Sequence, residues 1–391
     1  MLHIVTDLAL GGAEMMLLKL VSRSQPDRFT HSVVSLHSDG SLGPRFREAR
    51  IEVQSLGMSA RWPSVAPLVA LRAQVRGFDP VVIQGWMYHG NLAGVIGRWL
   101  GGGRAALAWN IRQTLYNLGN EKQMTAAVIR AGAKLSRRPA AIIYNSATSA
   151  AQHEQFGYEQ KSRMLIPNGF DCEAFAPDAE ARARTRAVLG FRQNDVVVAL
   201  VTRFHPMKDH RTFVAAAVQV AQAYPDARFL IVGRGVGAPD AGVIAALDRA
   251  GLRDRAVVLE ERYDIAELFN AADIACSSSA WGEGFSNAVG EAMACGVPCV
   301  VTDIGDSAAI VADTGIAVPA SNPAAMASAI GALVAAGPAG RRASGDAARV
   351  RVQQHFSLAT VVAQYESLYE KLARNGAQGR RMLAQTPIED R

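Results

Sequence analysis

The sequence has few of the features that mark secreted or membrane-spanning proteins. It contains four cysteines in 391 residues, none in a C-x-x-C spacing, and so too few for a disulfide scaffold. No apolar run reaches the roughly 18–20 residues that cross a bilayer. Residues 2–7 (LHIVTD) lack the basic lead and the long apolar segment of a signal peptide and are typical of a first strand. These absences lead us to expect a soluble, cytoplasmic protein.

Charged residues make up only 19% of the chain and hydrophobic residues 49%, so sizeable cores can form and general disorder is excluded. The charges are unevenly distributed: residues 1–170 hold 19 lysines and arginines against 10 acidic residues, and the remainder holds 22 against 25. A basic half indicates an anionic partner. Because zinc spacings, a recognition-helix signal and aromatic-basic RNA motifs are missing, an anionic small molecule or a membrane surface is favoured over nucleic acid.

Short β-branched runs alternate with Ala- and Leu-rich helical stretches along nearly the whole chain. Continuous apolar strands between helices are typical of parallel sheets covered on both faces, so the expected fold class is α/β with two doubly wound, Rossmann-like domains. A Pro-, Asn- and Gly-rich connector near residues 167–177 separates the two sets. Their strand ends should face a central cleft, the usual ligand site of open α/β sheets. The predicted strands are residues 33–36, 81–83, 141–144 and 164–166 in the first half, and 196–201, 229–232, 257–259, 273–275 and 299–301 in the second.

Two loops that follow predicted strands have the composition of anion sites. Residues 10–14 (LGGAE) contain glycines that allow backbone amides to approach a phosphate or a sugar, although an ordinary tight turn is the alternative. Arg203 and Lys208 follow the first strand of the second half, where two cations could clamp a diphosphate. Solvated loop charges are the alternative there.

A third segment, residues 281–298 (WGEGFSNAVGEAMACGVP), places two carboxylates around the start of a helix. Ser286 or Asn287 can cap a short helix that Gly296 ends. Glu283 then lies in the loop before the cap, and Glu291 lies one turn inside the helix. Carboxylates beside exposed helix N–H groups suit sugar hydroxyls and a phosphate. A helix-start acid and a surface glutamate are the alternative.

Taken together, these motifs resemble the retaining GT-B glycosyltransferases of glycosyltransferase family 4, of the bacterial polysaccharide type. The resemblance covers almost the full chain and includes residues 167–171 (PNGFD) and 232–235 (VGRG). It implies an acceptor-side domain over residues 1–170, a donor-side domain over 171–355, and a C-terminal helical segment over 356–391 that packs back on the first domain. The implied reaction moves a sugar from a UDP- or GDP-sugar to a saccharide acceptor, lipid-linked, in cell-surface polysaccharide synthesis.

The resemblance also implies the roles of individual residues. Arg203 and Lys208 would neutralise the donor diphosphate, Glu283 would bind hydroxyls of the transferred sugar, and Glu291 would hold the ribose. The family commonly places a histidine near the sugar, and His89 is the candidate here, although a histidine beside aromatic residues can equally be structural. Further donor contacts are expected from Gly12, Gly233, Gly284, Phe285, Ser286, Asn287 and Arg262, the last in a loop that passes near the base.

The sequence departs from the family pattern in ways that bear on the mechanism. The glycine loop contains Arg234 where the family often has an acid, and Phe170 replaces an aliphatic residue. No second carboxylate is placed as a covalent nucleophile, which favours a front-side displacement assisted by the leaving diphosphate. Because no Asp-x-Asp pair occurs in a strand-end loop, we expect no metal and no other cofactor, with the nucleotide-sugar as substrate.

Other readings remain open at this point. A GT-B sugar-nucleotide epimerase or a phosphorylase would share the two-domain architecture, and a non-catalytic membrane-associated nucleotide-sugar binder is a different class. A nicotinamide-binding Rossmann protein is disfavoured because residues 233–237 (GRGVG) lack the third glycine of G-x-G-x-x-G.

Residues 98–138 hold eight basic residues against one acid, Glu121. Apolar residues recur at helical spacing between Lys122 and Arg138, and such a helix can lie on an anionic leaflet. A core-facing helix with solvated cations is the alternative. We expect a peripheral enzyme on the inner face of the plasma membrane. The apolar positions are Met124, Ala127, Val128, Ala131 and Leu135.

Overall fold

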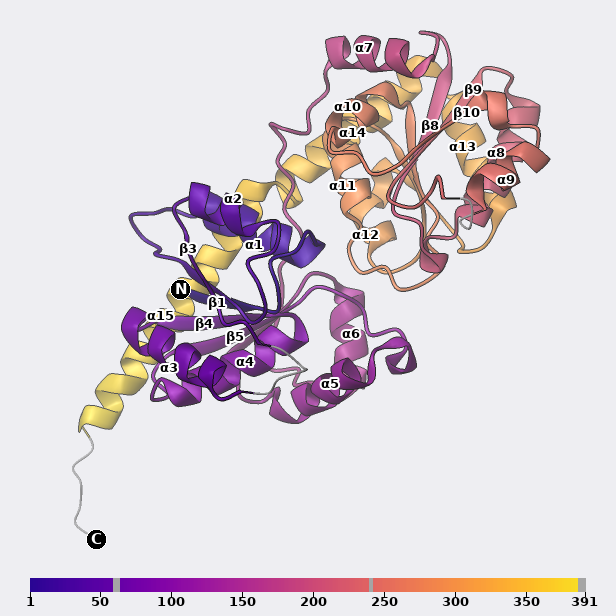
Figure 1. Cartoon of the computed structure of the whole chain (residues 1–391). Helices are drawn as coiled ribbons and strands as arrows, with labels where there is room; N and C mark the ends of the chain where they lie inside the picture. Colours follow the sequence, from indigo (N-terminus) through magenta and orange to yellow (C-terminus); the bar gives the residue numbers. More distant parts are fainter. Residues whose placement is uncertain (59–63, 239–241, 386–391) are drawn as a thin grey trace. The chain divides into compact units, whose positions relative to one another are not determined.

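The computed structural model describes residues 1–58, 64–238 and 242–385, which form two compact units (Figure 1). Unit 1 combines Met1–Pro167 with Ala359–Arg391, and unit 2 is Asn168–Leu358. The predicted boundaries after residues 170 and 355 each lie three residues away from the observed ones. The reason is a pair of backbone hydrogen bonds. Phe170 N donates to the Phe356 carbonyl (2.8 Å), and Leu358 N donates to the Phe170 carbonyl (2.7 Å), so both segments that lead from one unit to the other are held within unit 2.

Unit 1 contains a parallel seven-stranded sheet in the order β3-β2-β1-β4-β5-β6-β7. The interior strand β1 pairs with β2 and β4, so that Ile4 lies opposite Val34 and Gly85. The strands are β1 (Leu2–Val5), β2 (Ser32–Ser35), β3 (Glu52–Ser55), β4 (Val82–Trp86), β5 (Ala106–Ile111), β6 (Ala141–Tyr144) and β7 (Arg163–Leu165). The helices are α1 (Gly12–Arg23), α2 (Gly43–Glu48), α3 (Ala66–Phe78), α4 (Met87–Leu100), the 3-10 turn η1 (Leu118–Asn120), α5 (Gln123–Leu135), α6 (Ala147–Gln155) and α15 (Leu358–Gln385).

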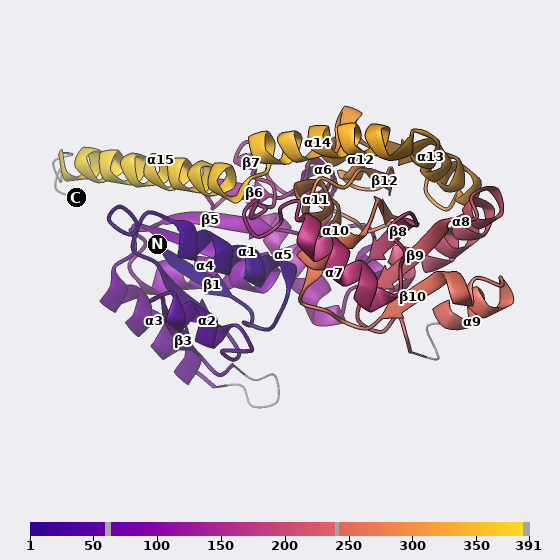
Figure 2. The same ribbon diagram turned by 90° about the horizontal axis from the view of Figure 1, so that it is seen from above.

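The C-terminal helix α15 packs on unit 1 through polar groups as well as apolar ones (Figure 2). Tyr369 is fully buried and donates its hydroxyl proton to Gln84 Oε1 (2.5 Å). Glu366, 5% exposed, accepts a hydrogen bond from Ser24 Oγ (3.0 Å). Because buried polar groups are costly unless they are paired, these bonds fix where the helix lies on unit 1.

The residues by which helix α5 packs on the core differ from the apolar face that was predicted to lie on a membrane. Ala126, Ile129 and Gly132 are its buried residues, whereas Met124 is 70% exposed and Ala127 is exposed. Of the predicted apolar face, Val128 and Leu135 pack partly against the core. The helix therefore packs on unit 1 through Ala126, Ile129 and Gly132, and it exposes the apolar Met124 beside exposed cations.

Unit 2 contains a parallel six-stranded sheet in the order β10-β9-β8-β11-β12-β13. One apolar cluster packs α8, α9 and α13 on one face, and a second packs α10, α11 and α14 on the other, as a doubly wound fold requires. The strands are β8 (Val196–Val201), β9 (Ala227–Val232), β10 (Ala256–Leu259), β11 (Ile274–Ser277), β12 (Cys299–Thr302) and β13 (Ile316–Val318). The helices and 3-10 turns are α7 (Ala179–Leu189), η2 (Pro206–Lys208), α8 (His210–Ala223), α9 (Val243–Arg249), η4 (Arg253–Arg255), α10 (Ile265–Ala271), α11 (Asn287–Ala294), α12 (Ser307–Val311), η5 (Ala312–Thr314), α13 (Pro323–Ala335) and α14 (Gly337–His355).

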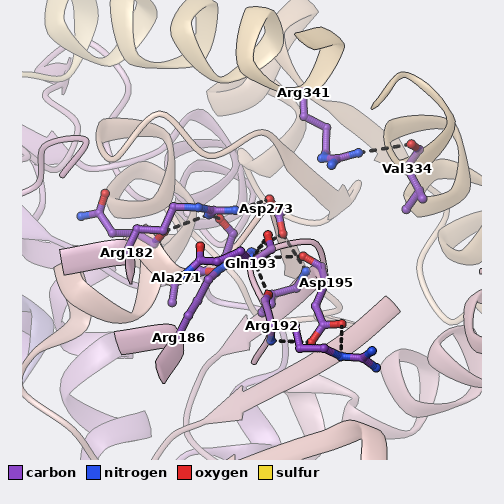
Figure 3. Close-up of polar contacts among 12 residues, drawn as sticks. Arg182, Arg186, Arg192, Gln193, Asp195, Ala271, Asp273, Val334 and Arg341 are labelled. Carbon is purple, nitrogen blue, oxygen red and sulfur yellow. Dashed lines mark hydrogen bonds and ion pairs between the residues drawn. The ribbon is translucent and has the colours of Figure 1, made fainter. Parts of the chain in front are cut away.

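The amino-terminal edge of this sheet is closed by a buried arginine (Figure 3). Arg186 is 0% exposed and forms an ion pair with Asp273 (2.5 Å), the residue before β11. Its guanidinium also donates to the carbonyls of Ala271 (2.9 Å) and Asp195 (3.1 Å), and Arg182 adds a second ion pair to Asp273 (2.7 Å). Burial lowers the pKa of Arg186, and the charge of Asp273 opposes that shift. The cluster joins α7 to the edge of the sheet opposite the strand carboxyl ends.

Within the described residues, no single helix combines the length and apolar composition needed to cross a bilayer. Helices α13 and α14 taken together have that length and composition, but they are bent by 108° relative to each other.

Candidate active site

The predicted donor residues of unit 2 lie on loops at the carboxyl ends of β8, β9, β10 and β11, or on the helix after β11. These strands are neighbours in the sheet, and parallel strands bring their carboxyl ends to one edge, where ligands of open α/β sheets bind.

Lys208 and Glu283 form an ion pair across two of these loops. Ser279 Oγ donates a second hydrogen bond to the same oxygen, Oε2 of Glu283 (3.0 Å). The loops are also joined through the backbone, because Ser278 Oγ donates to the Lys208 carbonyl (2.8 Å) and Ala280 N donates to the Met207 carbonyl (2.8 Å). The Glu283 carboxylate is thus oriented by two donors.

Arg203 is exposed on the same loop as Lys208, and the β9 loop lies directly beside it. Gly233 has φ +155°, and a Cβ there would lie 2.0 Å from the Thr202 carbonyl oxygen, so a side chain is excluded. Phe204 N donates to the Arg234 carbonyl (2.9 Å). Gly233, which was predicted as a donor contact, is therefore also required by the fold, because the two loops can touch only where this position has no side chain.

Glu260, which follows β10, holds the glycine loop and was not predicted. Its two carboxylate oxygens accept hydrogen bonds from the amides of Gly235 and Gly237, each at 2.8 Å. The sequence signal for it was weak, because an exposed acid after a strand is common. Arg262, expected near the base, uses its guanidinium on Asp264 (Nε to Oδ1, 2.8 Å), and that bond raises the pKa of Arg262.

The segment from Glu283 to Asn287 is held by backbone contacts and an aromatic core. A Cβ at Gly305, φ +63°, would lie 2.1 Å from the Glu283 carbonyl oxygen, and Asp306 N donates to the Gly284 carbonyl (2.9 Å). The Phe285 ring is 8% exposed and stacks on Phe170, 6.1 Å between centroids. Phe285 can therefore offer a ligand its backbone only.

Helix α11 begins within this segment. Ser286 is the N-cap residue, without a side-chain capping bond. Asn287 Oδ1 accepts a hydrogen bond from Asn168 Nδ2 (2.6 Å). Asn168 belongs to the PNGFD motif at residues 167–171, and no role was predicted for it from the sequence. Glu291 is half-buried in the second turn of the helix. Cys295 is buried, and burial followed by the Glu291 charge raises the pKa of its thiol to about 12.

In unit 1, Gly12 and His89 follow neighbouring strands. Gly12 is the first residue of α1 and is exposed. His89 lies in the first turn of α4, half-buried, where burial and then the charge of His37 lower its pKa. A Cβ at Gly90 would lie 2.4 Å from the Ile4 carbonyl oxygen, so this turn rests directly on β1. Met87, which opens α4, has φ +59°, an uncommon conformation for a residue with a Cβ.

Over residues 1–58, 64–238 and 242–385, no three His, Cys, Asp or Glu side chains gather in a group that could hold a metal ion.

Two family descriptions match the chain in succession. Residues 11–169 match the glycosyl transferase 4-like domain, and residues 195–336 match glycosyl transferases group 1. The chain belongs to this glycosyltransferase family. Together the two matches contain every predicted site position and all strands of the two sheets except β1.

Curated relatives of this glycosyltransferase family align with parts of the chain. A D-inositol 3-phosphate glycosyltransferase of Segniliparus rotundus is 34% identical over 189 residues, 47% of this chain and 41% of that protein. An Escherichia coli UDP-Gal:alpha-D-GlcNAc-diphosphoundecaprenol alpha-1,3-galactosyltransferase is 34% identical over 142 residues, 36% of each chain. The lipopolysaccharide core biosynthesis mannosyltransferase LpsB of Rhizobium meliloti is 28% identical over 247 residues, 61% of this chain and 68% of that protein. The chain thus spans less than half the length of the first two.

Solved structures show that the fold is GT-B. Anabaena HepE with UDP bound superposes with a TM-score of 0.83 at 21% identity, covering 95% of this chain and 99% of that one. WaaG, a glycosyltransferase involved in lipopolysaccharide biosynthesis, superposes with a TM-score of 0.71 at 14% identity, covering 94% and 99%.

Proposed function

We propose that this protein transfers a sugar, with retention of anomeric configuration, from a UDP- or GDP-sugar to a saccharide acceptor in cell-surface polysaccharide assembly. The observation that carries the proposal is the Lys208–Glu283 ion pair, on loops at the edge of the unit 2 sheet that also presents the exposed Arg203. Cations suit a diphosphate and a fixed carboxylate suits sugar hydroxyls. Family membership supports the assignment.

In the proposed reaction, the bond between the anomeric carbon and the diphosphate oxygen breaks while the acceptor oxygen bonds to the same face. The acceptor proton passes to the departing phosphate oxygen. Arg203 and Lys208 stabilise the negative charge that develops there, and Glu283 orients the sugar through its hydroxyls. Preorganised charges of this kind supply most of the rate enhancement in many enzymes. We propose that these two cations do so without a metal ion, so that activity persists in EDTA.

The proposed acceptor is lipid-linked, and the proposed location is the inner face of the plasma membrane. The names of the Escherichia coli and Rhizobium relatives refer to an undecaprenol-linked acceptor and to lipopolysaccharide core. In unit 1, Trp99 is 77% exposed and Met124 is 70% exposed. Lys122, Arg130 and Lys134 on or beside α5 are exposed as well. Exposed apolar groups among cations suit an anionic leaflet.

Ligand binding and product analysis test the proposal in turn. The purified protein is screened by thermal shift against UDP, GDP and ADP and their common sugars, because a ligand of the folded state raises the midpoint by mass action. The stabilising donor is then incubated with membrane lipid extract, and the anomeric configuration of the product is read by NMR. Conversion of the donor to its epimer without an acceptor, or a requirement for inorganic phosphate, would contradict the proposal.

A further inference from the structure

A cavity of about 590 Å³ in unit 2 lies between the start of α8 and α9. Neither Lys208, Glu283 nor Glu291 lines it. Its volume is within the range of sites that hold small metabolites. Phe204, Val214 and Ala246 form part of its wall.

His210 lines this cavity and is 5% exposed. Neither of its two ring nitrogens forms a hydrogen bond of normal length and angle with any of the described residues. Burial lowers the pKa of His210 to about 4, and the Thr202 carbonyl and the Asp209 charge oppose that shift only in part. The neutral ring therefore offers one donor and one acceptor. Buried polar atoms are rarely left unpaired, and a ligand hydroxyl can either accept a hydrogen bond from the protonated nitrogen of such a ring or donate one to the other nitrogen.

The charged residues of the wall are mainly basic. Arg211 and Arg249 are exposed at the cavity and have no ion pair among the described residues. Asp209 is the acidic residue among the described residues of the wall, and its carboxylate accepts hydrogen bonds from Thr212 Oγ1 (2.7 Å) and Ser321 Oγ (3.3 Å). The start of α8, a helix of 14 residues, adds partial positive charge. An anionic group is therefore favoured beside the two arginines.

We propose that this cavity binds a small phosphorylated polyol, with the phosphate on Arg211 and Arg249 and a hydroxyl group on His210. The chemistry of the wall accounts for each part of such a ligand: guanidinium groups for the phosphate, the unpartnered imidazole for a hydroxyl, and Phe204 and Val214 for the carbon skeleton. The wall borders the loop of Arg203 and Lys208 without including either residue, and this proposal does not depend on the proposed sugar transfer.

Isothermal titration of the full chain with glucose 6-phosphate tests the site, with inorganic phosphate and glucose as separate titrants. We expect glucose 6-phosphate to bind more tightly than either fragment. Arg249→Met and Arg211→Met should each weaken binding about tenfold or more, since a hydrogen bond to a charged group contributes about 1.5–3 kcal/mol. Arg192→Met, an exposed arginine at the other edge of the same sheet, is the matched control and should leave the affinity unchanged.

His210→Asn should weaken glucose 6-phosphate and leave inorganic phosphate unaffected. Ala246→Phe, on the surface of α9, should fill the cavity and abolish binding if the histidine variant does not fold. Absence of heat with glucose 6-phosphate at millimolar concentration would overturn the proposal. So would a loss of affinity in Lys208→Ala with none in Arg249→Met, because binding would then be at the donor site. Equal affinity for glucose 6-phosphate in the wild type and in a folded His210→Asn protein would reduce the site to a surface anion patch and overturn the polyol assignment.

Discussion

Lys208 and Glu283, 75 positions apart in the sequence, form an ion pair in which their side chains are 16% and 10% exposed. Two opposite charges largely withdrawn from water stabilise each other, and removing one leaves the other uncompensated. The pair thus holds both groups in place before any donor binds, and each variant of it has to be judged by folding as well as by turnover.

Replacing Lys208 by Met should lower kcat by about two orders of magnitude or more, as loss of a charge contact in the transition state does. Arg203→Ala should have a similar effect with less change in stability, because Arg203 is exposed. Steady-state kinetics and the thermal midpoint are measured on the same preparations. Near-wild-type turnover in a folded Lys208→Met protein would remove the diphosphate clamp from the mechanism.

Glu291→Ala should weaken binding of the free nucleotide, because this residue is proposed to hold the ribose. Glu283→Gln keeps the shape of the side chain and removes its charge, so it should impair turnover more than nucleotide affinity. Calorimetry with the free nucleotide separates the two. If both variants bind it like the wild type, the role proposed for Glu291 is wrong.

Unit 1 should lose stability as the pH falls below about 6.5, the usual histidine value. Burial lowers the pKa of His153 to about 4 and that of His31 to about 3. The unfolded chain then binds protons that the folded chain does not, so unfolding becomes easier from pH 6.5 down to those values. The cost is up to about 1.4 kcal/mol per histidine and pH unit.

Urea unfolding at pH 7.5, 6.0 and 5.0, followed by the fluorescence of the buried Trp86 and Trp109, measures this slope. His153→Gln can still meet Tyr88 and Ser149 and should flatten it. An unchanged slope in that variant would mean that His153 is not responsible.

Arg186→Met should destabilise unit 2 by about 3–5 kcal/mol, since it breaks a buried pair and leaves carbonyl groups unpartnered. Arg192→Met is the control: its side chain is 74% exposed and its ion pair with Asp195 is 3.5 Å long, so little change is expected. Hydrogen exchange of the β8 and β11 amides reports the difference. Equal protection in the two variants would contradict the structural role of Arg186.

Vesicle binding should rise with the fraction of anionic lipid and fall with added salt, because surface attraction is screened over about a Debye length. Arg130→Gln with Lys134→Gln should weaken it by about 2 kcal/mol, and Trp99→Ser should weaken it further. Arg192→Gln in unit 2 serves as the matched control. Flotation without recruitment at low salt would place the acceptor in the soluble pool.

Most of the predicted strands are short apolar runs that are buried in the sheet, which is the composition expected of strands covered on both faces. Strand β3 (Glu52–Ser55) was missed because it lies at the edge of the sheet and three of its four residues are polar. Strands β5 and β13 were missed as well, and β13 has only three residues.

The positions of the site residues on strand-end loops were predicted from the strands that carry them, while the roles assigned to these residues stay predictions. The supporting contacts were not, since Ser279 and Glu260 act through bonds that form only after folding. Gly305 is another such case. A side chain at Gly305 is excluded by the carbonyl oxygen of Glu283, which lies 22 positions earlier in the sequence.

Because α15 completes unit 1 from the far end of the chain, the ribosome delivers the two units in an unusual order. All of unit 2, closed by the pairing of Phe170 with Leu358, has left the exit tunnel before Tyr369 can reach Gln84. Domains usually fold in the order of synthesis, yet here unit 2 can fold before unit 1, which begins the chain, has all of its residues. During that interval the buried ring of His3, whose centroid lies 6.3 Å from that of Tyr369, is uncovered. A nascent chain released before residue 369 would therefore present a finished unit 2 beside a unit 1 that chaperones and proteases can still recognise.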